Sequence, residues 1–382
     1  MKTVGIICEY NPFHLGHKKQ FDLIRREFGP ETRIVCLMSG NFVQRGAPAI
    51  FDKSLRARAA VDSGADLVLE LPVTCALSSA EGFAAGGVRI LSPICDTLCF
   101  GTETGSRDAL LSTAGALLSP EFSEKLRIEL DKGLSFPAAR AAALEDDSLL
   151  QSPNDILAVE YCKAILAQGS QMDIFPITRE GSYHAGTPDP ENPSATSLRR
   201  CIASGTDWLS YIPASAHAAF ENAAVHTLET GQLAILARLR TMSDEDFEAL
   251  PYGSEGLWRK LMHACRDSAT QEEIIAKTKS KRYTRTRIDR MILCAYLGIT
   301  ADQMAAEPAY ARVLGFGDGG KAILKSARES LLLPHTGDRM EDPYQLLEQR
   351  CDDLYGLFAV NAPECAGTTA KRRVYICKNA GC

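Results

Sequence analysis

Near its N-terminus the chain reads Gly5-Ile6-Ile7-Cys8-Glu9-Tyr10-Asn11-Pro12-Phe13-His14-Leu15-Gly16-His17. The apolar run predicts a strand, and the amphipathic residues 17–27 predict a helix that the chain enters through His-x-Gly-His. Backbone N–H groups at the start of such a helix bind anions, and a glycine between two histidines lets a triphosphate approach the backbone. We therefore predict that His14 and His17 are catalytic and stabilise charge during attack on an α-phosphate with pyrophosphate leaving. The alternative is that they are two ordinary capping histidines.

Strand and helix patterns alternate through the first half of the chain. The predicted strands cover residues 3–8, 33–38, 66–71, 96–100 and 171–178. Amphipathic or Ala-rich segments, such as residues 53–63, separate them and predict helices. Strands separated by helices of this length predict an α/β fold with a Rossmann-like parallel sheet, in which ligands bind beyond the carboxyl ends of the strands.

The pattern changes after about residue 205 to long Ala/Leu/Glu-rich segments, which predict helices at residues 229–240, 256–267 and 271–280. Residues 311–316 and 373–377 read as short extended pieces. We therefore divide the chain into an α/β domain over residues 1–200 and a mostly α-helical domain over residues 201–382.

Composition limits the class of protein. A chain of 382 residues, 45% hydrophobic and 24% charged, is globular and long enough for two or three domains. The 42 basic and 48 acidic residues give a net charge of −6, which excludes a globally basic nucleic-acid surface but leaves room for a local one. There is no membrane-length apolar run and no signal-type N-terminus, so we expect a cytoplasmic protein with no membrane partner.

The cysteines do not predict a metal site. The 13 cysteines include no CxxC pair, and the spacing of Cys365, Cys377 and Cys382 fits no common zinc pattern. We expect them to be reduced, mostly buried thiols. Cys8, at the end of the first strand, invites a role as a thioester carrier, but a thiol in that place is more often part of the core or the lining of a site.

A second phosphate-binding pattern follows at Asn192-Pro193-Ser194-Ala195-Thr196-Ser197-Leu198-Arg199. Ser194 and Thr196 can cap a helix or bond phosphate oxygens, and Arg199 can neutralise the β- and γ-phosphates. Alone this segment indicates only a helix cap. Together with the histidine motif in the same predicted domain, it favours phosphate binding.

The two motifs resemble those of the nucleotidyltransferase superfamily, which has a similar HxGH and Ser/Thr-x-x-Arg helix. Four blocks are more specific: EYNPFH at residues 9–14, MSGNFVQRG at 38–46, GADLVLELP at 64–72 and SPNDIL at 152–157. They resemble the bacterial tRNA(Met) cytidine acetate ligase family, and a thinner likeness continues through residues 254–257 and 312–316.

The resemblance implies an ATP-dependent ligase that converts acetate to acetyl-adenylate and then acetylates the wobble cytidine of elongator tRNA(Met), releasing AMP. It implies ATP, with Mg²⁺, as the nucleotide, and no acetyl-CoA and no DNA. Three separate positions that match the family's nucleotide site are Gly101, Asn154 and Arg179. The segment that matches the family's ATP cradle comprises Ile7, Cys8, Glu9, Tyr10, Asn11, Pro12, Phe13, His14, Leu15, Gly16, His17, Lys18, Lys19 and Gln20.

Two further sets are candidates for contact with acetate or RNA. Asn41, Gln44 and Arg45 lie in a glycine-flanked loop after the second strand and could orient acetate or the cytosine edge; the alternative is a solvated loop. A basic stripe contains Lys279, Lys281, Arg282, Tyr283, Arg285 and Arg287. Such a stripe can hold phosphates while Tyr283 stacks on an unpaired base, although a solvated connection between helices would read similarly.

Two other functions stay open on the sequence. One is a small-molecule nucleotidyltransferase with the same HxGH core. The other is a non-catalytic, ATP-binding protein that interacts with RNA, which the intact pair of histidines disfavours. No phosphate-loop or dinucleotide-binding fingerprint is present, which disfavours a phosphate-loop kinase and a nicotinamide dehydrogenase.

Overall fold

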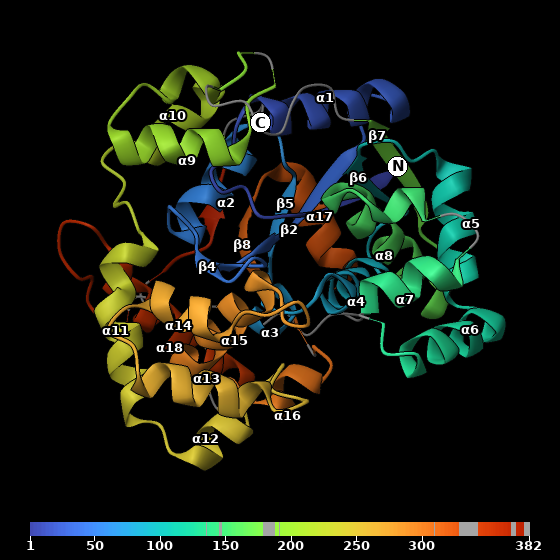
Figure 1. Ribbon diagram of the computed structural model, residues 1–382. Helices are drawn as coiled ribbons and strands as arrows, with labels where there is room; N and C mark the ends of the chain where they lie inside the picture. The colour runs from blue at the N-terminus through green and yellow to red at the C-terminus, as the bar shows by residue number, and fades with distance from the viewer. Residues whose placement is uncertain are drawn as a thin grey trace.

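The computed structural model describes residues 1–134, 136–144, 147–178, 188–190, 192–308, 310–327, 343–367 and 372–377. Arg179 and Cys382, both named above, lie outside these ranges. The centre of the molecule is a seven-stranded sheet of order β7-β6-β1-β2-β5-β8-β9 (Figure 1). Its strands are β7 (Asp173–Thr178), β6 (Thr97–Thr102), β1 (Thr3–Cys8), β2 (Arg33–Ser39), β5 (Leu67–Leu71), β8 (Arg312–Phe316) and β9 (Tyr375–Ile376).

The five strands predicted from the first half of the chain all form and pair in parallel, which confirms the fold class. Strand β8 differs, because it pairs antiparallel with β5, and β9 then pairs parallel with β8. The chain reaches β8 from the helical half, so no crossover helix between neighbouring strands constrains its direction. The sheet is therefore mixed at this edge.

Alternating residues of the strands explain why helices cover both faces of the sheet. In β2, Ile34, Cys36 and Met38 pack with α1 (Leu15–Phe28) and α2 (Lys53–Asp62). The intervening Val35 and Leu37 pack on the other face with α4 (Ala80–Leu91) and α8 (Pro153–Ala167). Strands buried on both faces read as continuous apolar runs, as these do.

The remaining elements of the first half flank this core. They are the hairpin β3 (Phe42–Val43) and β4 (Ala47–Pro48), and the helices α3 (Val73–Ala76), α5 (Arg107–Leu117), α6 (Pro120–Asp131), α7 (Phe136–Ala143), η1 (Ser148–Leu150), α9 (Ala195–Ser204), η2 (Leu209–Tyr211) and α10 (Ala214–Phe220).

The second half is mostly helical, and its three predicted helices are confirmed. A separate apolar core holds its helices together. Figure 1 shows these helices grouped together. The elements are α11 (Leu228–Thr241), α12 (Asp244–Glu248), α13 (Leu257–Arg266), α14 (Gln271–Thr278), α15 (Arg285–Leu297), α16 (Ala301–Ala305), α18 (Pro343–Tyr355) and η3 (Gly356–Phe358). Strands β8 and β9 and helix α17 (Asp318–Ala327) return to the sheet. A domain boundary near residue 200 stays a prediction. Among the described helices, none has the length and apolar character needed to span a bilayer.

A buried ionic cluster joins the two halves. The ammonium group of Lys53 lies 2.6 Å from Oε1 of Glu70 in β5 and 2.7 Å from Oδ1 of Asp352 in α18. All three side chains are at most 3% exposed. Arg312 of β8 and Arg372 also reach Asp352, and the first turn of α3 is bonded to α18 because Val73 N–H donates to Glu348 Oε1 at 2.6 Å. The position of the helical half on the sheet therefore depends on paired charges.

Glu348 gives this cluster a pH dependence. Burial, and then the nearby Glu70, raise the pKa of Glu348 from 4.5 to about 7. A carboxyl whose pKa is raised on folding contributes stability that is present below its unfolded pKa and is lost as the pH rises through 7. A glutamine does not titrate, so we expect Glu348→Gln to remove this loss. The free energy of unfolding of the variant should therefore increase relative to that of the parent as the pH rises from about 5 to about 8.

Urea unfolding across this pH range checks the prediction. The exposed Glu221→Gln serves as the control and should follow the parent at every pH. A Glu348→Gln variant whose stability runs parallel to that of the parent would show that Glu348 does not titrate in this range.

Candidate active site

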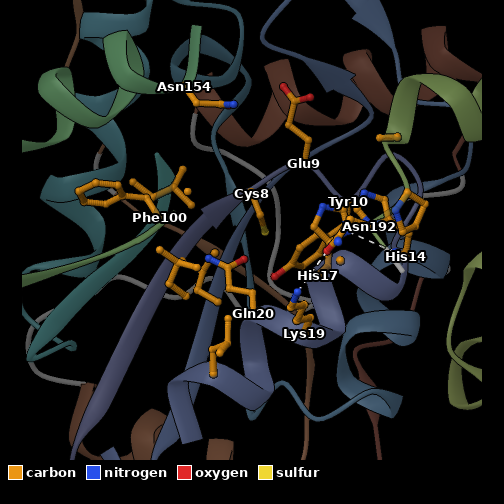
Figure 2. A pocket seen from close by; sticks show the side chains of 18 of the residues that line it. Cys8, Glu9, Tyr10, His14, His17, Lys19, Gln20, Phe100, Asn154 and Asn192 are labelled. Atoms are coloured by element: carbon orange, nitrogen blue, oxygen red, sulfur yellow. Dashed lines mark hydrogen bonds between the residues drawn. The ribbon is translucent and has the colours of Figure 1, made fainter. Parts of the chain in front are cut away.

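A cavity of about 600 Å³ lies beyond the carboxyl ends of β1, β6 and β7. Figure 2 shows His14, His17 and Asn192 on one side of this cavity and Phe100 and Asn154 on the other. The lining comprises Ile6, Ile7, Cys8, Glu9, Tyr10, Asn11, His14, Gly16, His17, Lys19, Gln20, Leu23, Arg26, Phe100, Gly101, Asn154, Leu157, Tyr161, Ile177, Thr178, Asn192, Pro193, Ala195 and Arg199. The cavity occupies the place at which open α/β sheets bind ligands.

The two histidines of the motif stack on each other at the start of α1. Their ring centroids are 3.6 Å apart with an angle of 22° between the planes. His14 N–H donates to Nδ1 of His17 at 3.2 Å, so a neutral His17 carries its proton on Nε2. A Cβ atom at residue 16 would lie 3.1 Å from the His14 ring, so Gly16 makes room for that ring. The motif therefore places an imidazole N–H donor beside the backbone N–H groups of a helix N-terminus.

Arg56 of α2 holds the turn that carries the motif. Its fully buried guanidinium donates to the carbonyl oxygens of Glu9 at 2.5 Å, Phe51 at 2.8 Å and Ser39 at 3.2 Å, and also to that of Gly40. Burial lowers the pKa of Arg56. The carboxyl ends of β1 and β2 are thus joined through one side chain. Sequence reasoning missed Arg56, because an arginine in an Ala-rich helix reads as a solvated residue.

Helix α9 brings its arginine to the same cavity. Nη1 of Arg199 donates to the Asn11 carbonyl at 2.8 Å, and Nη2 donates to Oγ1 of Thr196 at 3.1 Å. Ser194 caps α9, because its Oγ accepts from Ser197 N–H at 3.1 Å. Ser194 and Thr196 do not line the cavity, so the geometry favours the capping role for Ser194 and places Thr196 against Arg199.

The opposite wall contains Gly101 of β6 and Asn154 of α8, two positions at which the resemblance predicts nucleotide binding. The lining also contains four apolar or aromatic side chains: Phe100, Leu157, Tyr161 and Ile177. Sequence reasoning did not single out these four residues, because their apolar and aromatic side chains are the ordinary constituents of a core.

Some residues of the predicted ATP segment do not line the cavity. They are Pro12, Phe13, Leu15 and Lys18. Phe13 is fully buried against Tyr10 and Phe21, and Lys18 forms an ion pair with Asp22 on the helix surface. Phe13 therefore supports the motif from the core, and Lys18 lies on the outer surface of α1.

Cys8 lies in the lining, but its surroundings disfavour a nucleophilic role. Burial raises the pKa of Cys8 well above its usual value, as it does for Tyr10 and Tyr161 nearby. A thiol transfers acyl groups as its thiolate. The thiol lies in the lining and donates to the Leu37 carbonyl at 3.7 Å, which favours a role in the wall of the site over that of a thioester carrier.

The loop after β2 departs from the prediction at Asn41. This side chain is 3% exposed; its amide donates to Asp52 at 3.2 Å and Asp352 at 3.1 Å, and its oxygen accepts from Lys53 N–H at 2.8 Å. Both ends of the amide are used inside the protein, so Asn41 does not face a substrate. Gln44 bonds Glu9 Oε1 through its backbone N–H at 2.9 Å, and Arg45 is exposed at the tip of the loop.

The basic stripe separates into exposed and structural residues. Lys279, Lys281, Arg282 and Arg285 are exposed, the last paired with Glu272. Tyr283 is 8% exposed, its hydroxyl donates to the Glu255 carbonyl at 2.9 Å, and Arg287 covers its ring at 5.4 Å. The expectation that Tyr283 stacks on a base is wrong for this conformation, because the ring is already covered.

Known proteins resemble the chain over nearly its whole length. A family model described as HIGH Nucleotidyl Transferase matches residues 1–367. A tRNA(Met) cytidine acetate ligase of Acetivibrio thermocellus is 34% identical over 375 residues, covering 87% of each chain. Another of Clostridium novyi is 36% identical over 358 residues, covering 87% of this chain and 89% of its own.

Solved structures agree with the sequence relatives. The structure of Thermotoga maritima TmcAL without ligand superposes with a TM-score of 0.89 at 29% identity, covering 98% of this chain and 99% of that one. The same protein bound with alpha-thio ATP gives a TM-score of 0.86 at 28% identity, with the same coverage. The chain therefore belongs to the tRNA(Met) cytidine acetate ligase family of HIGH nucleotidyltransferases, which is a family of ligase enzymes.

Proposed function

We propose that the protein is an ATP-dependent ligase that activates acetate as acetyl-adenylate and transfers the acetyl group to the wobble cytidine of elongator tRNA(Met). The observation that carries the proposal is the stacked pair His14 and His17 at the start of α1, beside Arg199 in one cavity. Membership of the ligase family supports the choice of acetate and tRNA(Met) as substrates.

The first step needs little acid or base catalysis, because acetate is already a carboxylate nucleophile. Its oxygen attacks the α-phosphate in line, and the P–O bond to pyrophosphate breaks. The α1 N-terminus and His17 Nε2–H stabilise the negative charge that develops on the phosphoryl oxygens. Arg199 and Lys19, which also line the cavity, are suited to the departing pyrophosphate. Catalysis at this step is positioning and electrostatic stabilisation.

A Mg²⁺ ion bound with ATP is compatible with the lining. Glu9 is the only carboxylate among the described residues that line the cavity, and Mg²⁺ with a nucleotide commonly uses one or two carboxylates beside the phosphates. Glu9 would hold the ion, which would supply positive charge for the triphosphate.

In the second step the exocyclic amine of cytidine attacks the acetyl carbonyl, the bond from the acetyl carbon to the phosphate oxygen breaks, and AMP leaves while the amine releases one proton. An anticodon loop can present a splayed base at low cost, because its bases are not held in a duplex. The exposed basic residues of α14 and α15 and of the segment between them form the proposed tRNA surface. They lie on the helical half of the molecule (Figure 1).

The tRNA surface is tested by the double variant Lys279→Ala/Lys281→Ala. Loss of two phosphate contacts should weaken tRNA binding and reduce the slope of log affinity against log salt by about 1.5. Affinity for ATP should not change. The control is Lys125→Ala/Arg127→Ala, two exposed basic residues of α6 on the other side of the molecule (Figure 1). If the slope of log affinity against log salt is equal for both double variants, the tRNA surface lies elsewhere.

The adenylation step is tested by exchange of labelled pyrophosphate into ATP. Exchange that depends on acetate is the expected result, since formation of acetyl-adenylate is reversible while pyrophosphate is present. Exchange that proceeds equally well without acetate would favour a different acyl or nucleotidyl acceptor, such as that of a small-molecule nucleotidyltransferase. No exchange with any short acid would favour the non-catalytic alternative.

A further inference from the structure

Asp155 is a buried carboxylate in the first turn of α8, and it is 1% exposed. Its oxygens accept from Glu103 N–H at 2.7 Å, Thr104 N–H at 3.2 Å and Thr104 Oγ1 at 2.7 Å. Thr102 Oγ1 also donates to it. The donors thus come from three successive residues of the turn that follows β6.

This carboxylate does not act as the cap of its own helix. Ser152 is the N-cap of α8, and its Oγ accepts from Asp155 N–H at 3.4 Å. The Asp155 carboxylate faces the β6 turn instead. Burial raises the pKa of Asp155, but the hydrogen bonds from Thr102, Thr104 and Glu103 outweigh it and hold the pKa below its usual range. The carboxylate is therefore ionised when it organises the turn.

A second contact links the same two segments. Nδ2 of Asn154 donates to Oε1 of Glu103 at 2.8 Å. Glu103 is thus held by two adjacent residues of α8, by its side chain from Asn154 and by its backbone from Asp155. Thr102 Oγ1 also accepts from Gly105 N–H at 2.9 Å, which closes the turn.

The turn begins directly after Gly101, and Asn154 directly precedes Asp155. Gly101 and Asn154 both line the cavity, and they come from different elements, β6 and α8. The hydrogen bonds to Asp155 therefore fix the position of one wall residue relative to the other. Hydrogen bonds to a charged group are stronger than neutral ones, so the relative position of Gly101 and Asn154 is well determined.

We propose that Asp155 is a positioning residue for the nucleotide: by binding the turn at residues 102–104, it holds Gly101 and Asn154 at the separation that ATP binding requires. The inference rests on the proposed function, because it assumes that ATP occupies this cavity. Asp155 itself is outside the lining, so the proposal gives it no direct contact with the nucleotide.

The test is Asp155→Asn, which keeps the shape of the side chain but places an NH₂ group against backbone N–H donors. We expect the KM for ATP in tRNA acetylation to rise about tenfold, the effect of losing one charged hydrogen bond. The kcat at saturating ATP should stay within about threefold, and the KM for tRNA should not change. Calorimetric titration with ATP should show the same loss of affinity.

Lys163→Ala is the matched control, because it removes the ion pairs of the same helix with Glu81 and Glu160, more than two helical turns away from Asp155. It should lower the melting temperature while the KM for ATP stays within about twofold. An equal rise in KM for both variants would overturn the proposal, since Asp155 would then act only through the stability of α8. A folded Asp155→Asn protein with an unchanged KM would also overturn it.

If Asp155→Asn does not fold cooperatively, Thr104→Val decides the question. Thr104 is exposed, and this variant removes only its hydroxyl hydrogen bond to Asp155. A rise of about threefold in the KM for ATP supports the proposal, and no rise overturns it. Failure of the parent protein to bind ATP would overturn the proposed function, and with it this inference, before any variant is compared.

Discussion

His17→Ala is expected to lower the rate of acetate-dependent pyrophosphate exchange by at least about 100-fold, the usual cost of removing one donor from a preorganised anion site. The variant loses the imidazole that lines the cavity and stacks on His14 at 3.6 Å. The backbone N–H groups of α1 remain, so some affinity for ATP should survive. The loss should therefore appear mainly in kcat, because the charge that His17 stabilises develops in the transition state.

His217→Ala is the matched control for this experiment. His217 is an exposed residue of α10 and does not line the cavity. Its variant should exchange pyrophosphate at the parent rate. Thermal unfolding of both variants separates a loss of catalysis from a loss of folding. A well-folded His17→Ala enzyme with parent-like exchange would contradict the nucleotidyltransferase mechanism.

The second large effect is expected in stability. Asp352→Asn should destabilise the protein by about 3–5 kcal/mol, because it removes one partner from a buried ion cluster. Lys53, Arg312 and Arg372 all reach this carboxylate, at 2.7, 3.5 and 2.9 Å, and would lose its charge. Asp318→Asn is the control, since its partner Lys321 is 58% exposed and such surface pairs contribute about 1 kcal/mol or less.

The stability from Asp352 should also depend on pH in a defined direction. Burial would raise the pKa of Asp352, but Lys53, Arg372 and Arg312 lower it from 3.8 to about 2. Its contribution is present above the unfolded pKa and is lost as the pH falls through 2. Urea unfolding at about pH 7 and about pH 3 should therefore show a smaller difference between parent and variant at the lower pH. A difference that does not shrink would contradict this role.

Much of the sheet could be predicted from the sequence, because its signal is local. Parallel strands buried on both faces appear as apolar runs such as residues 33–38, and the helices between them show their own period. The direction of β8 could not be predicted in this way. The direction of β8 depends on the place at which the chain returns from the helical half to the sheet, and only long-range packing determines that place.

The residues of the candidate site also separate into those that the sequence predicts and those that it does not. His14 and His17 could be found because their spacing lies within one short segment. Arg56 and Asp155 could not be found in this way. Their hydrogen-bond partners lie in distant segments of the chain, and only folding brings the partners together. The prediction that Asn41 contacts a substrate is wrong for the same reason. Its glycine-flanked loop reads as accessible, but the amide group of Asn41 donates to Asp52 and Asp352 inside the protein.

The most direct test of the proposed function is to incubate the purified protein with ATP, labelled acetate and unmodified tRNA(Met), and to analyse the nucleosides by mass spectrometry. A parallel reaction supplies acetyl-CoA in place of acetate and ATP. Labelled acetylcytidine formed from acetate and ATP, with none from acetyl-CoA, is the predicted result. No acetylcytidine from acetate and ATP, or formation from acetyl-CoA alone, would contradict the proposal.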